Sequence, residues 1–576
     1  MAEAITPAAL VFTPHSPRAV AQSRNVTDPD ACLQGRDTLL DAGASLVLDF
    51  GEELVGVLEL TCEAEGATQI ELIEGEDLEE ALLVKDPFPP EHWYHQPRDI
   101  LNLAPGPQTA RNQGRRAFRY ANLIVHGPGR LRLRGAKTIL EHAPVTDRGS
   151  FNCSDPLLNA AWAISRRTVR LCMQGFYEDG VKRDGMLWIG DYRVEFLCSH
   201  YLFADAALAR RSLEMFAQCR HPNGSLSAVA LHAGGHLYPR ISYLGELSKP
   251  GGLHEWVLDN YCADFVSGVW EYVLHTGDTA LATQLAPVTR GVIDYLAGVD
   301  LTTSVPGRNF ITDNQPETKD WWGSRAALGY QLAASFGDAA RLAELLGDAA
   351  LASRCRGLCA DRRRETVAKF GDPAQAAARD DLTASATRSW HAHTAAYLAG
   401  AVDAAQLRDI YSQLQADPAV RRPMAGFMEF YHLQAWLDAG LVVEALDEMR
   451  SYYGQMLRSG ATTTWEIVDR REPGIDHIQP AGRSHCHGWS AGPACLLPAH
   501  ILGVTPTTPG YRTVDIRPAL GDLAWAEGDI PTPHGDIRVS LKSPLSGEIV
   551  LPEDITGTLR LPGREPHMLS AGRTIF

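Results

Sequence analysis

The stretch SFNCSDPLLNAAWAISRRTVRLCMQ, residues 150–174, is where the chain changes from one pattern of apolar residues to another. From Leu157 to Leu171 the apolar side chains recur at the three- and four-residue spacing of one helical face, which predicts a helix. Ser154 or Asp155 is the expected N-cap, and the proline that follows suits the first turn. We therefore expect a helical domain to begin here.

Upstream of this helix, short alternating apolar and polar runs are broken by glycine and proline, from about residue 44 to residue 143. In GVLELTCEAEGATQIELIEGEDL, one run ends after Leu60 and the next includes Ile70, with a turn between them. Such runs predict antiparallel strands packed as a sandwich. We assign residues 1–148 to an N-terminal β-sandwich domain.

Downstream, roughly a dozen helical patterns continue to about residue 500, joined alternately by short turns and by long stretches rich in Trp, Asp and His. Helices in antiparallel pairs, with long loops on one side, are what a closed double ring of helices requires, and the loops would line a shared cavity. Alternating strand patterns return after Pro506. The resulting assignment is a helical domain over residues 149–503 and a C-terminal β-sandwich over residues 504–576.

Length and charge limit the possible functions. At 576 residues the chain should form roughly two to four domains, each able to bury a sizeable core. The formal net charge of −17, which no basic run offsets, argues against a nucleic acid or an anionic membrane as a partner. A neutral or cationic ligand fits this charge better.

Cysteine usage and the first residues bear on the compartment. The eleven cysteines are an odd number and are scattered along the chain, which suits reduced thiols better than a disulfide framework. The sequence begins without the charged segment and apolar core of a secretory signal, and no apolar run is long enough for a membrane span. A cytoplasmic location is expected.

The chemistry is concentrated in EDGVKRDGMLWIGD, residues 178–191. Asp179, Asp184 and Asp191 are five and seven residues apart on a glycine-rich segment, where their mutual repulsion must be offset by neighbouring cations or by a ligand. Trp188 supplies a flat apolar face on which a sugar ring can stack. One carboxylate can bond two sugar hydroxyls while another donates a proton to a glycosidic oxygen. The alternative is a solvated acidic loop that caps the next helix.

This segment resembles the signature of the α-L-rhamnosidases of glycoside hydrolase family 78, roughly Asp-Cys-Pro-Gln-Arg-Glu-Arg-Leu-Gly-Trp-Thr-Gly-Asp. The matching positions are Asp179, Arg183, Trp188, Gly190 and Asp191. RGSFNCSDPLLNAAW, SGATTTWEIVD and SHCHGWSAGP are similar to further segments of the family. LDFGEELVGVLEL resembles its N-terminal sandwich, and the strands after Pro509 resemble its closing β-domain, so the resemblance spans nearly the whole chain.

The resemblance implies an inverting hydrolase built on an (α/α)6 barrel flanked by β-sandwich domains. By position, Asp184 corresponds to the general acid and Glu466 to the general base. The other matches are Asp179 and Asp191 with carboxylates that hold the rhamnose hydroxyls, Trp188 with an aromatic residue of the sugar subsite, and His487 with a histidine beside the base.

One departure concerns the acid, because the family usually has Glu where this chain has Asp184, which is one methylene shorter. Either Gly185 lets the backbone approach the substrate more closely, which we favour, or the acid function is weakened or taken by a neighbour. Since a cation would oppose the protonated form of the acid, Arg183 is better interpreted as structural.

Several other residues have two readings. The tryptophans of the loops and helix starts either line the cavity, which we favour, or pack in the core; they are Trp256, Trp321, Trp322, Trp465 and Trp489. Asp259 and Asp320 could bond sugar hydroxyls or cap helices. The His-x-His pairs 391/393 and 485/487 suggest a metal only weakly, since this spacing on a helix points the two rings apart. We expect no metal and no cofactor.

These observations together predict a cytoplasmic hydrolase that releases terminal α-linked L-rhamnose from oligosaccharides or small glycosides. Two rivals stay open, an (α/α)6 glycosidase for a different sugar and a sugar-binding relative that has lost catalysis. A β-sandwich face could also mediate a homodimer.

Overall fold

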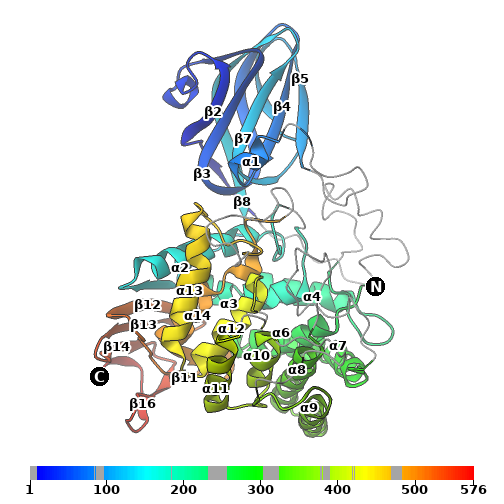
Figure 1. The fold of residues 1–576 in the computed structure, drawn as a ribbon, viewed down its shortest axis with the longest axis vertical. Coiled ribbons are helices and arrows are strands. Elements are labelled where there is room, and N and C mark those ends of the chain that lie inside the picture. The colour runs from blue at the N-terminus through cyan, green and yellow to red at the C-terminus, as the bar shows by residue number, and fades with distance from the viewer. Residues whose placement is uncertain are drawn as a thin grey trace.

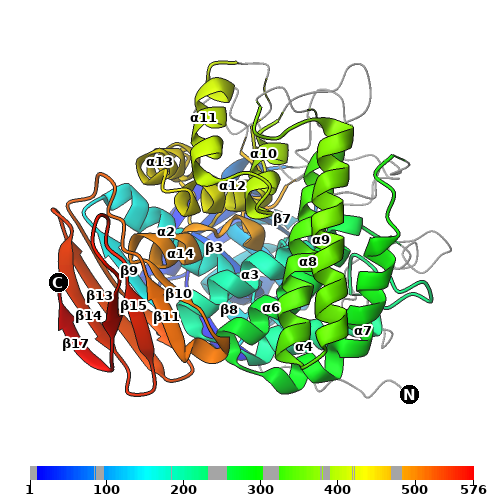
Figure 2. The same ribbon diagram turned by 90° about the horizontal axis from the view of Figure 1, so that it is seen from below.

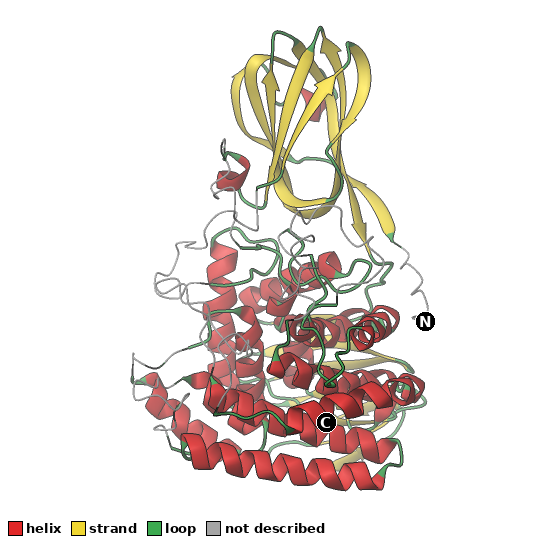
Figure 3. Ribbon diagram, turned by 90° about the vertical axis from the view of Figure 1, so that its right-hand side faces the viewer, coloured by secondary structure: helices red, strands yellow, loops and turns green. Residues whose placement is uncertain are grey.

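The computed structural model of the chain describes residues 10–83, 85, 96–182, 185–230, 256–302, 324–375, 379, 389–417, 420, 422–468 and 483–576. Within these residues the order of elements is strands, then helices, then strands, as the sequence predicts. Figure 1 shows the N-terminal strands standing above the helices, with the C-terminal strands beside the helices. The same separation of strands from helices is seen in Figure 3.

The N-terminal region is a hydrogen-bonded array of eight strands. It contains β1 (Val11–His15), β2 (Ala19–Val26), β3 (Thr38–Glu65), β4 (Thr68–Gly75), β5 (Arg98–Leu103), β6 (Gly106–Arg111), β7 (Arg116–His126) and β8 (Arg130–His142). The strand order is β1-β8-β3-β7-β4-β5, and β2 and β6 also pair with β3. The short helix α1 (Leu78–Ala81) follows β4. The predicted turn between the runs of Leu60 and Ile70 is confirmed as the turn between β3 and β4.

The long strand β3 organises this region because it pairs with four different strands. Its pairing with β7 shifts register between Asp49 and Leu54. Gly51 lies within this shift with φ of +79°, a backbone conformation that glycine adopts without strain. Residues of β3 on both sides of this register shift contribute to a core of apolar side chains, and this core belongs to the N-terminal region alone.

The middle region is helical. Its helices are α2 (Pro156–Cys172), α3 (Ile189–Phe203), α4 (Ala207–Gln218), α6 (Asp259–Thr276), α7 (Thr279–Ala297), α8 (Arg325–Leu345), α9 (Ala349–Phe370), α10 (Trp390–Leu398), α11 (Ala404–Gln415), α12 (Gly426–Asp438), α13 (Val442–Arg458) and α14 (Pro493–Leu496). Asp155 is the N-cap of α2 and accepts from the backbone N–H groups of Leu157 and Leu158. Of the two caps that the sequence allowed, the structure uses this one.

Alternate helices differ in burial. Nearly every residue of α3, α6 and α12 is buried, whereas α4, α11 and α13 bury one face each. Helix α3 packs against α6, α6 against α8, α8 against α10 and α10 against α12, and α14 packs against α3. Successive contacts therefore link α3, α6, α8, α10 and α12 into an inner set, and both α12 and α14 contact α3 (Figure 2).

Two sheets follow the helices. One has the order β10-β11-β15-β16 and the other β17-β14-β13-β12-β9. Their strands are β10 (Val504–Pro506), β11 (Thr513–Ile516), β12 (Trp525–Thr532), β13 (Gly535–Lys542), β14 (Ser546–Leu551), β15 (Thr556–Leu559), β16 (His567–Leu569) and β17 (Gly572–Ile575). The strand patterns that we identified after Pro506 all correspond to strands of these sheets.

The edge strand β9 (Ser150–Cys153) comes from the other end of the helical region. It lies antiparallel to β12, with Cys153 opposite Ala526 and Ser150 opposite Asp529. Our assignment gave these residues to the helical domain. In the structure they form an edge strand of a C-terminal sheet. One continuous apolar core joins the helices to both C-terminal sheets. No helix among the described residues is long and apolar enough to cross a bilayer. The eleven cysteines all lie in the described part, and no disulfide joins them.

The chain enters the helical region through a tight approach at Gly149. Its N–H donates to the carbonyl of Leu202 at 2.8 Å, and a methyl carbon on Gly149 would overlap the backbone carbonyl of Tyr201. No rotamer can relieve a clash with backbone. We expect Gly149→Ala to lower the free energy of unfolding by about 1–3 kcal/mol, measured as a lower thermal midpoint.

Gly135→Ala on β8 is the matched control, because a methyl carbon there meets nothing within 4 Å. It should leave the midpoint almost unchanged. Equal midpoints for the two variants would contradict the packing described at Gly149.

Candidate active site

The loop between α2 and α3, residues 173–188, carries the first half of the candidate site. Asp179 is buried, and its Oδ1 accepts the N–H of Met186 at 2.9 Å while its own N–H donates to the Met186 carbonyl at 3.1 Å. Its carbonyl accepts the N–H of Gly488 at 2.8 Å. Asp179 is thus fixed both across its own loop and to a segment about 300 residues away.

Asp191 lies in the first turn of α3 and is 2% exposed. Its Oδ2 accepts the hydroxyl of Tyr261, in the first turn of α6, at 3.4 Å. Its Oδ1 lies 3.2 Å from His487 Nε2. A helix N-terminus favours negative charge, so this position suits an ionised carboxylate.

The loop between α13 and α14, residues 459–492, carries the second half. Glu466 is 1% exposed, its Oε1 lies 2.7 Å from Arg483 Nη1, and its Oε2 accepts the N–H of Ser484 at 3.0 Å. The indole of Trp489 donates to the Glu466 carbonyl at 3.1 Å. The cation and the N–H both stabilise a negative charge on this side chain.

His487 joins the two halves. Its Nε2 faces Asp191, and its Nδ1 lies 3.9 Å from Glu466 Oε2. Ligand atoms of Asp179, Asp191 and His487 all lie within 4.8 Å of one another, and all three residues are buried. The set could hold a cation or the hydroxyls of a polar ligand. Gly180 approaches the His487 ring so closely that a methyl carbon at this position would contact it.

Aromatic rings surround these groups. Trp188 meets Trp256 edge to face at a centroid distance of 5.5 Å, Trp465 stacks on His485 at 4.6 Å, and the Trp489 ring lies 4.3 Å from that of His487. Trp188, Trp465 and Trp489 are each less than 10% exposed. These rings therefore pack in or against the core, close to the polar groups of the site.

Some candidates from the sequence lie outside the described residues: Arg183, Asp184, Asp320, Trp321 and Trp322. Gly185, which follows Asp184 in the sequence, has a left-handed φ of +58°, a conformation that glycine adopts without strain. Asp259 lies in the first turn of α6, where its Oδ1 accepts the hydroxyl of Tyr295 at 2.6 Å. Neither role predicted for Asp259 follows from this bond.

The structure also brings in residues that the sequence did not single out. Tyr261 bonds Asp191, Arg483 pairs with Glu466, and Ser484 donates to Glu466. Tyr261 appeared only as part of a helical pattern, and its one signal was its place two residues after Asp259. Arg483 and Ser484 stand beside the His-x-His pair of residues 485 and 487. That pair is split, because one ring stacks on Trp465 and the other contacts Asp191.

Burial controls two further titratable groups near the site. Burial, reinforced by the Asp191 charge, raises the pKa of Glu195 well above its usual value. Burial, with the nearby Lys182 charge, lowers the pKa of His485 to about 4. The His485 side chain is therefore neutral at pH 7, and the protonated form of Glu195 is favoured. Glu195 lies where a side chain at residue 488 would overlap it, which accounts for Gly488.

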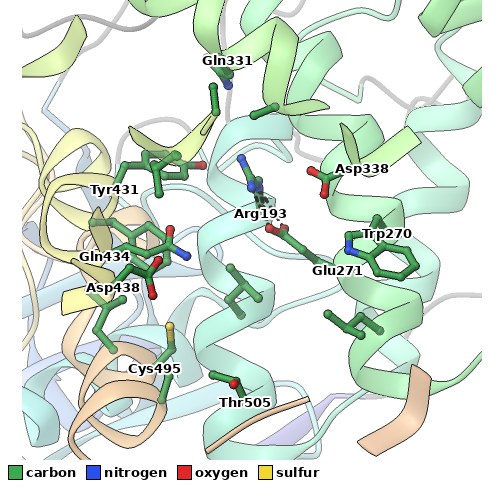
Figure 4. A pocket seen from close by; sticks show the side chains of 18 of the residues that line it. Arg193, Trp270, Glu271, Gln331, Asp338, Tyr431, Gln434, Asp438, Cys495 and Thr505 are labelled. Carbon is green, nitrogen blue, oxygen red and sulfur yellow. Dashed lines mark hydrogen bonds and ion pairs between the residues drawn. The ribbon is translucent and has the colours of Figure 1, made fainter. Parts of the chain in front are cut away.

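A separate cavity of about 440 Å³ lies along the inner helices, and Asp179, Asp191 and Glu466 do not line it. Arg193, two residues beyond Asp191 on α3, is one of its lining residues (Figure 4). The charged groups that line it largely satisfy one another. Arg193 pairs with Glu271 at 2.7 Å, and Arg341 pairs with Asp338. We therefore locate the candidate site at the two loops and not in this cavity.

Two family models match most of the chain. Residues 146–501 match the family model described as the bacterial alpha-L-rhamnosidase 6 hairpin glycosidase domain, and residues 503–575 match the C-terminal domain of the same proteins. An alpha-L-rhamnosidase of Alteromonas sp. (strain LOR) is 40% identical over 88 residues, which is 15% of this chain and 9% of that protein.

Two solved structures are similar over most of the chain. A family 78 rhamnosidase of Bacillus sp. GL1 has a TM-score of 0.76 and 28% identity, covering 92% of this chain and 54% of that one. A Klebsiella oxytoca rhamnosidase with rhamnose bound has a TM-score of 0.72 and 26% identity, covering 85% of this chain and 96% of that one. The chain spans about half the length of the Bacillus enzyme and a small part of the Alteromonas protein.

The neutral His485 predicts a pH dependence of stability. The folded chain keeps this imidazole unprotonated down to a pKa of about 4, whereas the usual value is 6.5, so the unfolded state binds more protons between these values. Lowering the pH from 6.5 to 4 should therefore cost on the order of 3 kcal/mol of unfolding free energy at this residue. Thermal midpoints across this range should fall less in His485→Gln than in the wild type.

His126→Gln controls for the loss of an imidazole, since His126 lies on the exposed surface beside Glu71. Its midpoints should fall as steeply as those of the wild type. A His485→Gln profile parallel to the wild type would show that this ring is not held neutral.

Proposed function

This chain belongs to the bacterial α-L-rhamnosidase family, and on that premise we propose that it is an inverting hydrolase that releases terminal α-linked L-rhamnose. Asp184 is the general acid and Glu466 the general base. The helices form a closed (α/α)6 barrel, since α14 returns to pack against α3. The regions 1–148 and 504–576 flank the barrel as β-sandwich domains.

One observation carries the proposal. Asp179, Asp191, His487 and Glu466 are separated by up to 308 positions, and their side chains lie together in one buried place. A cluster of buried carboxylates costs free energy unless it is compensated, so such a set is typical of a functional site. The Klebsiella oxytoca structure, similar over 96% of its length, has rhamnose bound, which supports this sugar as the ligand.

The sugar-binding side of the mechanism follows from Asp179, Asp191 and His487. Carboxylates accept two hydroxyls each, and an imidazole can donate to or accept from another. Because His487 Nε2 faces Asp191, its Nδ1 is directed toward the Glu466 side. Trp188 would offer its face to the ring carbons. Together these groups would hold a small polyhydroxylated ring beside Glu466.

In inverting hydrolysis the acid and the base stand on opposite faces of the ring, about 6.5–9.5 Å apart, so that a water molecule fits before the base. Glu466 must be ionised to accept a proton from this water, and Arg483 and the Ser484 N–H favour that state. Asp184 must be protonated to donate to the leaving oxygen, and the charges of Asp179 and Asp191 would favour this form.

Removing either proposed proton-transfer group tests their roles. Asp184→Asn and Glu466→Gln should each reduce kcat on an aryl α-L-rhamnoside by roughly 10²–10⁴-fold or more, because general acid–base catalysis contributes this much. Glu444→Gln, on the exposed face of α13, is the control and should keep wild-type turnover. Near wild-type hydrolysis by either site variant, with an unchanged thermal midpoint, would exclude the role assigned to that residue.

The stereochemistry of the product tests the mechanism itself. Proton NMR of the reaction with an aryl α-L-rhamnoside should show β-L-rhamnose first, followed by mutarotation, since direct attack by water inverts the anomeric carbon. If α-L-rhamnose forms first, the reaction is not inverting. Binding of rhamnose without turnover would favour the alternative of a sugar-binding relative that has lost catalysis, which the shorter side chain of Asp184 suggested. Hydrolysis of a different aryl glycoside would identify another sugar as the substrate.

A further inference from the structure

The α2–α3 loop is held by carboxylates of the N-terminal β region. Lys182 Nζ lies 2.8 Å from Glu76 Oε2 and 2.8 Å from Glu80 Oε1, and the three side chains are each at most 5% exposed. Glu80 is oriented in turn, because its Oε2 accepts the Glu76 N–H at 2.8 Å. Lys182 precedes the proposed acid Asp184 by two residues in the sequence, so these contacts hold the last described residue of the segment that leads to the acid.

Glu76 also contacts the α13–α14 loop. The His485 N–H donates to Glu76 Oε2 at 2.7 Å, and the Ser484 hydroxyl donates to Glu76 Oε1 at 3.3 Å. The N–H of the same Ser484 donates to Glu466 Oε2. One carboxylate from a different domain thus contacts the segment before the proposed acid and the residues that hold the proposed base.

A second contact binds the other end of the same segment. Arg115 Nη2 lies 2.8 and 2.7 Å from the two oxygens of Glu178, which is fully buried and directly precedes Asp179. Arg115 also pairs with Glu141 of β8 at 3.3 Å. The segment from Glu178 to Lys182 is therefore attached to the N-terminal region at both ends, with Asp179 between the attachments.

Stability alone explains the Glu76 cluster poorly. Burying ions costs several kcal/mol each, and apolar replacements of buried ion pairs are often as stable or more so. Burial raises the pKa of Glu76 to about 7 and also raises that of Glu80, so their ionised forms are costly here. The interface already has an apolar contact, made by Val55, Ala117, Leu171, Cys172, Val181 and Cys486. The ionic contacts add directional bonds to the two loops.

We propose that Glu76 is a positioning residue of the active site, which sets the separation of the acid and the base through Lys182 on one side and Ser484 and His485 on the other. The N-terminal β region is then an integral part of the catalytic unit. This inference rests on the proposed function for its kinetic consequence. Small displacements of reacting groups cost large factors in rate, so the effect falls on turnover.

The test compares Glu76→Gln with the wild type on an aryl α-L-rhamnoside. Glutamine has no negative charge and only one acceptor oxygen. It therefore cannot attract Lys182, accept the His485 N–H and accept the Ser484 hydroxyl as Glu76 does, so the two loops separate. We expect kcat to fall by about 10–100-fold. KM should rise by a smaller factor than kcat falls, because Asp191 lies on α3, outside both loops, and still binds the sugar.

Glu59→Gln is the matched control. Glu59 lies in β3 of the same region and also pairs with two cations. One is Arg111, and the other is Lys137, whose Nζ lies 3.0 Å from Glu59 Oε2. Both partners belong to the N-terminal region and not to the two loops. It should retain wild-type kcat. A merely structural role for Glu76 predicts that both variants lose thermal stability and that neither changes the ratio of kcat to KM.

Hydrogen exchange supplies a readout that does not require hydrolysis. In Glu76→Gln, peptides that cover residues 178–188 and 483–490 should exchange faster than in the wild type, while peptides of α9 should not. If the single variant does not fold, the double variant Glu76→Gln with Lys182→Met removes one charge of each sign and should show the same loss of kcat and the same exchange.

The outcomes separate the two ideas. Wild-type protein that does not hydrolyse the rhamnoside would overturn the proposed function, while faster exchange at both loops would still support the positioning contacts. Wild-type kcat, or unchanged exchange at either loop, in a folded variant would overturn the role of Glu76 whatever the wild type hydrolyses.

Discussion

The architecture of the site depends on the need to compensate buried carboxylates. Asp179, Asp191, Glu466, Glu76 and Glu178 are all at most 5% exposed, and an unpaired buried charge costs more than a protein of ordinary stability can tolerate. Asp191, Glu76 and Glu178 find partners on elements far away in the sequence. The partners of Asp179 and Glu466 lie 7 to 18 positions away, on the same loops. The partners are backbone N–H groups, guanidinium groups, an ammonium group, a phenol and an imidazole. Satisfying these charges therefore requires the N-terminal region and the two loops of the helical region to come together.

This requirement gives the flanking regions different parts. The C-terminal sheets share one apolar core with the helices and take β9 from the segment before α2, so they are fused to the helical region by packing. The N-terminal region keeps a core of its own and meets the helices through one small apolar cluster and several polar contacts. Its contacts are concentrated on the two loops of the site. Such an interface fixes where those loops lie relative to the N-terminal region. This is the basis of the role that we assign to Glu76.

The geometry also distinguishes a site from a cavity. The cavity along the inner helices has a volume of about 440 Å³, yet its charged groups largely bond one another. At the two loops, in contrast, three ligand-bearing side chains lie within 4.8 Å of one another beside the Glu466 carboxylate. Several ionisable side chains in close contact are typical of a functional site, whereas charged groups that only pair with one another along a cavity wall are not.

The sequence by itself determined the local structure and the chemical inventory. Periodicity gave α2 with a cap at Ser154 or Asp155, alternation gave β3 and β4, and the resemblance selected Asp179, Asp191, Glu466 and His487. These features could be predicted because helix faces, caps and strand alternation are set by interactions within a few residues. The acidic segment that contains Glu76 offered no such local signal.

Only the tertiary structure decided which side chains meet. Tyr261 reaches Asp191 across 70 positions, and Ser484 and His485 reach Glu76 across more than 400. β9 pairs with a strand over 370 residues later in the chain. Such contacts depend on how whole elements pack, and packing energy is spread over many side chains and leaves no short sequence pattern.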